Sequence, residues 1–252
     1  AELTPFTIFG LQELEKMNEC LIEMARALNE LELGLAGALN ISDVMDALII
    51  NLSLNQVPNL WLKICSQVGP TGPYNRKPLG SWFQDLLLRR KQLLEWGVER
   101  AMQLPPSIWI AGLFNPMGFV TATLQVTARQ KELPLDAMVV NTEVTDKDAP
   151  QIEAQPADGS YIHGYYMEGA RWDRQANTIA ESRPKELHPP MPVVHVMGIT
   201  ADQVVTEGVY DCPVYNTSIR GPTYVYTAKL RTVDPPHKWT LAAACLLSQP
   251  DA

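Results

Sequence analysis

The sequence lacks the features that mark several large classes of protein. Its 252 residues carry 20 Lys and Arg against 28 Asp and Glu, a net charge of −8, so no basic face for nucleic acid phosphates is expected. No apolar run approaches the roughly 18 residues that a membrane-spanning helix needs. We therefore predict that neither nucleic acid nor a membrane is a partner.

Cysteine is scarce, and its spacing is uninformative. The four cysteines lie far apart and form no Cys-x-x-Cys pair, which is unlike a zinc site or a disulfide framework. Free buried thiols are the expected state. The residues are Cys20, Cys65, Cys212 and Cys245.

Catalytic motifs are missing as well. There is no Gly-x-Ser-x-Gly elbow, dinucleotide fingerprint or His-Glu-x-x-His, and the Gly- and Pro-rich segment 67–77 lacks the spacing of a phosphate loop. No histidine has a partner at metal-ligand spacing, so we predict no metal and no cofactor. We interpret the four histidines as structural, either hydrogen-bonded or exposed: His163, His188, His195 and His237.

The composition is that of a folded globular protein, with 46% hydrophobic and 19% charged residues. The sequence begins with Ala1 rather than methionine and shows no signal-peptide pattern. These two observations predict a segment of a longer, cytosolic polypeptide.

The first half of the sequence has helical periodicity. Between residues 11 and 35, leucines and methionines recur at steps of three and four, which places them on one helix face: Leu14, Met17, Leu21, Met24, Leu28, Leu31 and Leu35. This face suits either a short coiled-coil seam or packing across a neighbouring surface, and we favour the second use. Further helices are predicted at 42–54, 57–64, 81–103 and 116–129.

The second half has the two-residue period and the turn signals of strands. Short strands separated by such turns indicate an antiparallel barrel or sandwich, and hence an α+β fold. We predict a helical subdomain at 1–135 and a β subdomain at 136–252. The strands are expected at 138–144, 160–167, 177–181, 192–199, 208–214, 222–231 and 238–247.

The segment 158–173 carries the densest set of candidate residues. Gly164 interrupts its strand, which suits a bulge or a close backbone approach. Glu168, Arg171 and Asp173 contain the groups of a small acid/base cluster. The structural alternative, which we favour, is that Arg171 stabilises a tight turn covered by Trp172.

The same segment carries a family resemblance. Gly159-Ser-Tyr-Ile-His-Gly-Tyr-Tyr-Met-Glu-Gly-Ala-Arg-Trp-Asp173 closely resembles the signature of the C-terminal region of dynein heavy chains. The resemblance continues, in the same order of blocks, at 104–119, 181–187 and 210–215, and covers most of the sequence from Val57 onward. Ile219-Arg-Gly-Pro-Thr-Tyr-Val225 looks like axonemal dyneins, specifically the outer-arm gamma type.

The resemblance implies a helical part followed by a small antiparallel β-barrel, without catalytic activity. It implies a regulatory and structural domain that packs on one face of the AAA+ ring and modulates microtubule-based motility. The expected partners are the ring modules of the same heavy chain, whereas dynein intermediate and light chains and the microtubule are reached only through the parent motor. The expected location is the cytoplasm, in the axoneme of a cilium or flagellum.

Two other functions remain open from the sequence. One is a free-standing ligand-binding barrel with a helical lid, which an apolar pocket inside the barrel would favour. The other is a hydrolase built on Glu168 and Asp173, which requires the two carboxyls to converge about 5–10 Å apart in a cleft. For the dynein hypothesis, the candidate interaction or structural residues are Leu14, Leu21, Leu28, Glu168, Arg171, Trp172 and Asp173.

The missing phosphate loop generates a first prediction. The purified 252-residue protein is expected not to bind or hydrolyse ATP, because no glycine-rich turn ending in Lys-Ser/Thr is present to hold the phosphates. Titration with a fluorescent ATP analogue is the measurement. Saturable binding at micromolar concentration, competed by unlabelled ATP, would contradict the prediction.

Overall fold

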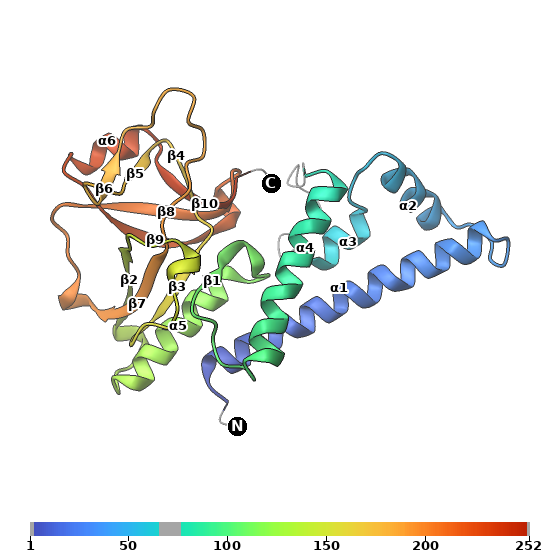
Figure 1. Ribbon diagram of the computed structural model, residues 1–252, viewed down its shortest axis with the longest axis horizontal. Coiled ribbons are helices and arrows are strands. Elements are labelled where there is room, and N and C mark those ends of the chain that lie inside the picture. Colours follow the sequence, from blue (N-terminus) through green and yellow to red (C-terminus); the bar gives the residue numbers. More distant parts are fainter. Residues whose placement is uncertain (1–2, 66–76, 251–252) are drawn as a thin grey trace.

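The computed structural model describes residues 3–65 and 77–250, and it arranges helices before strands as the sequence predicts. Figure 1 shows the two parts, a group of helices on one side and a β-rich body on the other. The α+β class is therefore confirmed. Segment 67–77, which the sequence excluded as a phosphate loop, lies outside the described residues except for Lys77.

The helices begin where the sequence supplies caps. Thr4 accepts a hydrogen bond from the amide of Thr7 ahead of Pro5, and Asn115 accepts one from Gly118 ahead of Pro116. No helix among residues 3–65 and 77–250 is long and apolar enough to cross a membrane. The α-helices of this half are α1 (Pro5–Leu35), α2 (Asp43–Ser53), α3 (Asn59–Cys65), α4 (Leu79–Leu94) and α5 (Pro116–Gln130).

The buried face of α1 is rotated from the stripe of leucines and methionines that the sequence suggests. Met17, Met24 and Leu31 are buried as expected. Leu28 and Leu35, in contrast, are 42% and 67% exposed. The other buried positions from residue 13 onward are small or polar residues that a hydrophobicity pattern does not select: Glu13, Cys20, Ala27 and Gly34.

The helix predicted at 81–103 ends early. After α4 the backbone forms a π-helix, Glu95–Glu99, and then turns through Ala101 and Met102, which both have positive φ. The amide of Met102 donates to the carbonyl of Trp96, which closes the helix end before Pro105 is reached. Local backbone geometry rather than proline therefore ends this helix.

In the part of the chain that the structure describes, the strands form two four-stranded sheets and a two-stranded ribbon. The order is β1-β3-β7-β2 in one sheet and β4-β10-β8-β9 in the other, and β5 pairs with β6. The strands are β1 (Ile108–Trp109), β2 (Met138–Val144), β3 (Ser160–His163), β4 (Tyr166–Glu168), β5 (Arg171–Asp173), β6 (Thr178–Ala180), β7 (Val194–Thr200), β8 (Val209–Thr217), β9 (Tyr224–Arg231) and β10 (Cys245–Gln249).

Two of the predicted strands are corrected. The strand expected at 238–247 is wrong in its first half, because Pro236 starts a short helix, α6 (Pro236–Leu241), before β10 begins. The strand expected at 160–167 is divided at Gly164, where φ is +89°. A Cβ atom at Gly164 would lie 2.5 Å from Cδ1 of Trp109, so the close approach expected there is confirmed.

The sheets are mixed rather than purely antiparallel. β1 pairs with β3, and β10 with β8, in parallel. β10 lies on the opposite side of β8 from β9, so the connection between β9 and β10, which contains α6, crosses β8. No ladder between described strands closes the sheets into a barrel, so the barrel remains a prediction.

One side chain links the two sheets. The hydroxyl of Thr142, on β2, accepts from the amide of Lys229 on β9 at 2.6 Å and donates to its carbonyl at 3.1 Å. Thr142 is buried, so its two hydrogen bonds satisfy the amide and the carbonyl of Lys229 in place of water. The two sheets are therefore joined through a side chain where a backbone ladder is missing among the described strands.

The buried side chains of residues 3–65 and 77–250 form two hydrophobic clusters. The larger one fills the β-rich body and includes Phe9 of α1 and Phe119 of α5, whose ring centroids are 5.6 Å apart. The smaller cluster lies among α1 to α4 and includes Met17, Leu31 and Trp61. The division into subdomains at 135/136 is not decided by these clusters and stays a prediction.

Glu13 lies on α1 between the two clusters and is buried. Its carboxylate accepts hydrogen bonds from the amides of Phe114 at 2.6 Å and Asn115 at 2.9 Å. Arg89 of α4 is close enough to favour its charge, and its guanidinium lies 4.2 Å from the ring centroid of Phe114. This network fixes α1 and α4 to the segment before α5. The stripe of leucines and methionines in the sequence did not predict this network.

We predict that Glu13→Ala destabilises the protein by about 2–4 kcal/mol, because the buried amide of Phe114, the partly buried amide of Asn115 and the nearby Arg89 lose their anionic partner. Chemical denaturation monitored by circular dichroism measures the loss. The control is Glu15→Ala, an exposed neighbour on the same helix. Equal stability of the two variants would contradict the assigned role.

Glu13 also predicts a pH dependence. Burial raises the pKa of its carboxyl above the ordinary value, although the two amides and Arg89 oppose the shift. The folded state then binds a proton more readily than the unfolded state, so stability falls as pH rises from about 4 through the raised pKa. The stability of wild type relative to Glu13→Gln is expected to decrease over that interval. A constant difference would exclude a raised pKa.

Candidate functional site

The predicted acid/base cluster begins at Glu168, the last residue of β4. One of its carboxylate oxygens accepts from the guanidinium of Arg220 at 2.9 Å. The other oxygen is buried and has no hydrogen-bond partner among the described residues. Arg220 itself has φ +61° and ψ −146°, a region that a residue with a side chain seldom occupies. The ion pair therefore holds a strained turn against the end of β4.

Arg171 and Asp173 lie on β5, so the tight turn expected at Arg171 is in fact a strand. The turn comes afterwards, and Asp173 stabilises it by accepting from the amides of Gln175 and Ala176. These amide hydrogen bonds are the main reason that the pKa of Asp173 is lowered. Arg171 donates to Asp173 at 3.1 Å. Asp173 is thus held as a carboxylate that organises a turn.

Trp172 lies between these two charged residues in the sequence, but its side chain is buried in the larger hydrophobic cluster. It is 7% exposed, and its indole nitrogen has no hydrogen-bond partner among the described residues. Because neighbouring residues of a strand point to opposite faces, Arg171 and Asp173 lie on the other face of the ribbon. Trp172 therefore contributes apolar packing.

The carboxyls of Glu168 and Asp173 are engaged by different partners, Arg220 for the first and Arg171 with two backbone amides for the second. General acid catalysis needs a carboxyl whose pKa is raised, and that of Asp173 is lowered. The arrangement suits two structural ion pairs better than a hydrolytic pair.

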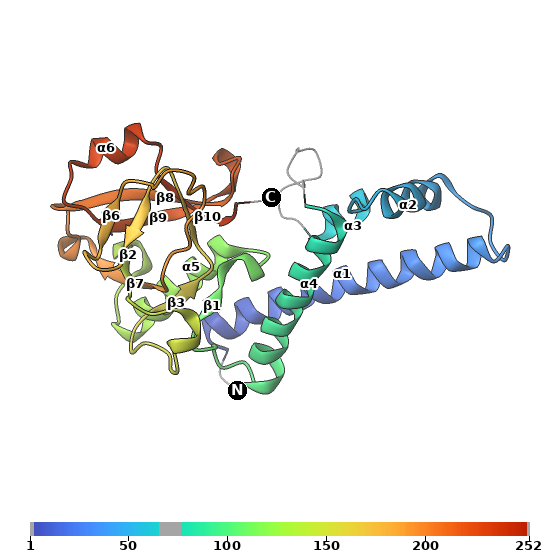
Figure 2. The same cartoon turned by 45° about the horizontal axis from the view of Figure 1, so that its top comes forward.

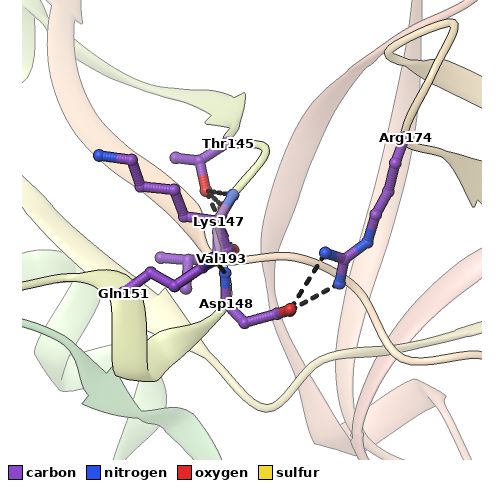
Figure 3. Close-up of polar contacts among 6 residues, drawn as sticks. All are labelled: Thr145, Lys147, Asp148, Gln151, Arg174 and Val193. Atoms are coloured by element: carbon purple, nitrogen blue, oxygen red, sulfur yellow. Dashed lines mark hydrogen bonds and ion pairs between the residues drawn. The ribbon is translucent and has the colours of Figure 1, made fainter.

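A contact that the sequence did not suggest joins the ribbon to the first sheet. Figure 3 shows Arg174, in the turn after β5, with two guanidinium nitrogens directed at Asp148, in the loop after β2. The distances are 2.6 and 3.1 Å. Asp148 also starts a one-turn helix, in which the backbone amide of Asp148 donates to the side chain of Gln151. The hydrogen bond from Arg174 lowers the pKa of the Asp148 carboxyl. Asp148 and Arg174 are 26 positions apart, so their spacing in the sequence gives no sign that they pair.

The three candidate leucines of α1 are not brought together with the segment 168–173. Leu14 and Leu21 are half-buried and pack against the smaller cluster, whereas Leu28 is exposed. Leu14 contacts the π-helix closely, since a Cβ atom at Gly97 would lie 2.6 Å from its Cδ1. The structure therefore separates the candidates into a helical group on α1 and a group on β4 and β5.

A cavity of about 580 Å³ lies between the helices and the edge of the first sheet. Its lining includes Lys91, Trp109, His163 and Tyr166. Burial lowers the pKa of His163 to about 4, and its Nδ1 atom has no hydrogen-bond partner among the described residues. The prediction that His163 is either hydrogen-bonded or exposed is thus incorrect for that nitrogen. His195, in contrast, bonds through Nε2 to the carbonyl of Asp158 at 2.6 Å.

The cysteines are unpaired covalently, and three of them are buried. The fourth, Cys65, is half-buried at the end of α3, which corrects the expectation that all four are buried. Within residues 3–65 and 77–250, no three His, Cys, Asp or Glu side chains are placed to share a metal ion.

One family model matches the protein over nearly its whole length. Residues 1–248 match the family described as the C-terminal domain of the dynein heavy chain. The protein belongs to this family.

Individual dynein heavy chains show which type it resembles. The protein is 45% identical over 251 residues to dynein axonemal heavy chain 17 of Homo sapiens and 46% identical over 255 residues to the dynein alpha chain, flagellar outer arm, of Chlamydomonas reinhardtii. It is 44% identical over 248 residues to the ciliary dynein beta chain of Tripneustes gratilla. These matches include 98–99% of the present sequence but only 5–6% of the length of the relatives.

These dynein relatives confirm the axonemal type that the sequence blocks indicated. They carry the designations alpha and beta as well as axonemal heavy chain 17. The gamma-type assignment made from segment 219–225 is not shown by them. Arg220, the second residue of that segment, has a structural role through its ion pair with Glu168.

The buried position of Trp172 generates a prediction about this dynein domain. Trp172→Ala is expected to cost about 3–5 kcal/mol of stability, since an aromatic ring is removed from the core. Arg171→Ala is the matched control, because its partly exposed ion pair is worth no more than about 1 kcal/mol. Thermal unfolding of both variants is the measurement. Trp172→Ala melting within about two degrees of wild type would show that the ring adds little to the core.

Proposed function

We propose that this protein is a non-catalytic regulatory and structural domain of an axonemal dynein heavy chain. In this proposal it packs on one face of the AAA+ ring of the same heavy chain and modulates microtubule-based motility in the axoneme of a cilium or flagellum. Intermediate chains, light chains and the microtubule are reached only through the parent motor. The family membership over residues 1–248 is the observation that carries the proposal.

The form of the helical part supports ring packing. In Figures 1 and 2, α1 extends away from the β-rich body, and α2 lies near its far end. α1 has 31 residues, and the part after Glu13, which packs with the smaller cluster and no longer in the larger one, spans roughly 33 Å. The arm formed by α1 and α2 is therefore suited to bridging modules, while the body provides a compact anchor.

The surface of this arm is apolar at many exposed positions. A free monomer seldom leaves large apolar side chains in water in such number, so a covering surface is expected. The residues that are exposed by 42% or more along α1 from Ile22 onward, along α2 and in their connection are Ile22, Leu28, Leu33, Leu35, Leu39, Ile41, Val44, Ile50 and Leu54.

The candidate residues divide between two roles in this proposal. Leu28, together with Leu35, contributes to docking on the ring, whereas the half-buried Leu14 and Leu21 hold α1 to its neighbouring helices. Glu168, Arg171, Trp172 and Asp173 keep the ribbon and the adjacent turns in place. We also propose that residues 1–135 and 136–252 form the two subdomains, the second a small barrel whose sheets Thr142 links.

The alternative of a ligand-binding barrel has less support. The inward side chains of the two sheets, including Val194, Val214 and Leu246, are fully buried and pack into one cluster. The cavity of about 580 Å³ lies beside the first sheet rather than within the cluster. An interior filled with side chains leaves little room for an apolar ligand.

The proposal predicts that charges on the exposed arm weaken regulation of the motor without removing its activity. Leu28→Glu with Leu35→Glu in the heavy chain is expected to lower affinity of the domain for the ring by about ten-fold or more, since two apolar contacts become buried charges. Single-molecule motility on microtubules is the measurement. Stall force or run length should change, while basal ATPase activity is retained.

The control for this experiment is Leu187→Glu, which places the same charge at a position that is 78% exposed on the β-rich body. Circular dichroism of both variants tests whether the domain remains folded. Stall force and run length that are unchanged in the double variant, or altered to the same extent in the control, would contradict docking through α1.

A further inference from the structure

The outer face of α2 carries two acidic residues followed by two apolar ones. Asp43 and Asp46 lie in the first turn of the helix, and both are exposed. Ile50 and Leu54 continue the same face, because residues three and four apart in a helix are neighbours, and they are 57% and 61% exposed. No Lys, Arg or His occurs between residues 27 and 62, so no cation close by in the sequence balances the two carboxylates.

The outer face of α4 shows the complementary pattern in the opposite order. Phe83 and Leu87 come first, and they are 43% and 50% exposed. Arg90 and Lys91 follow within one turn on the same face, and both are exposed. α4 thus presents an apolar beginning and a basic end, whereas α2 presents an acidic beginning and an apolar end.

The basic end of α4 is not neutralised by the described part of its own chain. The two acidic residues nearest to it in the sequence already have partners. The ion pairs are Asp85 with Lys77 and Glu95 with Arg100. Arg90 and Lys91 have no ion-pair partner among residues 3–65 and 77–250. Their two charges are therefore available to another molecule.

The two faces match each other when the helices run antiparallel. Positions 46, 50 and 54 on α2 are four residues apart, as are positions 83, 87 and 91 on α4, and each step advances about 6 Å along either helix. The pairs brought together are Leu54 with Phe83, Ile50 with Leu87, and Asp46 with Lys91. This direction also places the N-terminus of α2 beside the C-terminus of α4, which is the favourable arrangement of two helix dipoles.

The two faces do not cover each other within one molecule, because the side chains on both are exposed. Figures 1 and 2 show α2 towards the far end of α1, whereas α4 crosses α1 nearer to the β-rich body. A separate copy of the protein, in contrast, carries both the acidic and the basic face and can supply the missing partner for either one.

We propose that a second copy of this protein covers these faces, with α2 of one copy packed antiparallel on α4 of the other. The apolar side chains provide the contact, and the opposite charges set its direction and register. The proposal does not depend on the function proposed above, in which Leu28 and Leu35 of α1 dock on the ring. In heavy chains, such a contact would join two motors through their C-terminal domains.

The proposed interface is small. Stable complexes bury about 1,200–2,000 Å² in total, and helices of 11 and 16 residues that meet along one face bury less than this. We therefore expect weak association, with a Kd on the order of 10–100 µM, that weakens as salt screens the exposed charges.

The test is sedimentation velocity of the purified 252-residue protein from about 5 to about 200 µM. In about 50 mM NaCl the weight-average mass should rise about 1.4-fold or more over this range, and in about 500 mM NaCl the rise should be at least halved. A protein that stays monomeric at the highest concentration in low salt would contradict the proposal.

Two charge-reversal variants identify the surfaces. Arg90→Glu with Lys91→Glu reverses the face of α4, and Asp43→Lys with Asp46→Lys reverses that of α2. Each variant alone should remain monomeric, because like charges then oppose each other. An equimolar mixture should associate at least as strongly as the wild type, since α2 of each variant then meets the opposite charge on α4 of the other. Both variants keep a net negative charge, so overall attraction between them does not account for such a rescue.

The matched control for another surface is Leu28→Glu with Leu35→Glu on α1, which should associate as the wild type does. Circular dichroism checks that every variant is folded. Three outcomes would overturn the proposal: association that either charge-reversal variant retains, a mixture that stays monomeric, or association that only the α1 variant loses.

Discussion

The arrangement of the whole molecule depends on one buried carboxylate. Glu13 lies where the aromatic packing of Phe9 ends and the helical cluster around Met17 begins, so α1 belongs to both hydrophobic clusters. By accepting from the amides of Phe114 and Asn115, it fixes α1 to the segment that starts α5. Asn115 in turn caps α5, which packs on the first sheet. Glu13 thus fixes the register of α1 on the body, because directional hydrogen bonds set a position that apolar contacts alone leave adjustable.

Much of the helical half could be predicted, because its signals are local. Ser42 and Asn115 mark where two of the predicted helices begin, whereas α1 begins at Pro5, before the predicted stripe. The buried face of α1 could not be assigned correctly, since its seven buried positions from 13 to 34 include a glutamate, a cysteine, an alanine and a glycine. Which face is covered depends on what packs against it, and periodicity does not contain that information. The strand predicted at 238–247 was likewise wrong in its first half, because Pro236 starts α6 and the buried Trp239 belongs to that helix.

Around the β5–β6 ribbon too, the sequence predicted some features and missed others. The signature containing Trp172 identified the family, but it did not show that Glu168 pairs with Arg220, or that Arg174 reaches Asp148. Both contacts join segments that are distant in the sequence, and their energies depend on tertiary placement rather than on neighbouring residues.

One edge of the first sheet is covered by a side chain from the helical half. β1 is an edge strand of two residues, and Gln92 of α4 accepts from the amide of Trp109 at 2.7 Å and donates to its carbonyl at 3.1 Å. A side-chain amide therefore occupies the groups with which a strand of another molecule would pair. Helix α4 therefore protects this edge against pairing with another molecule. A β-rich body produced without α4 would present an unpaired edge, and self-association through added strands would be the consequence.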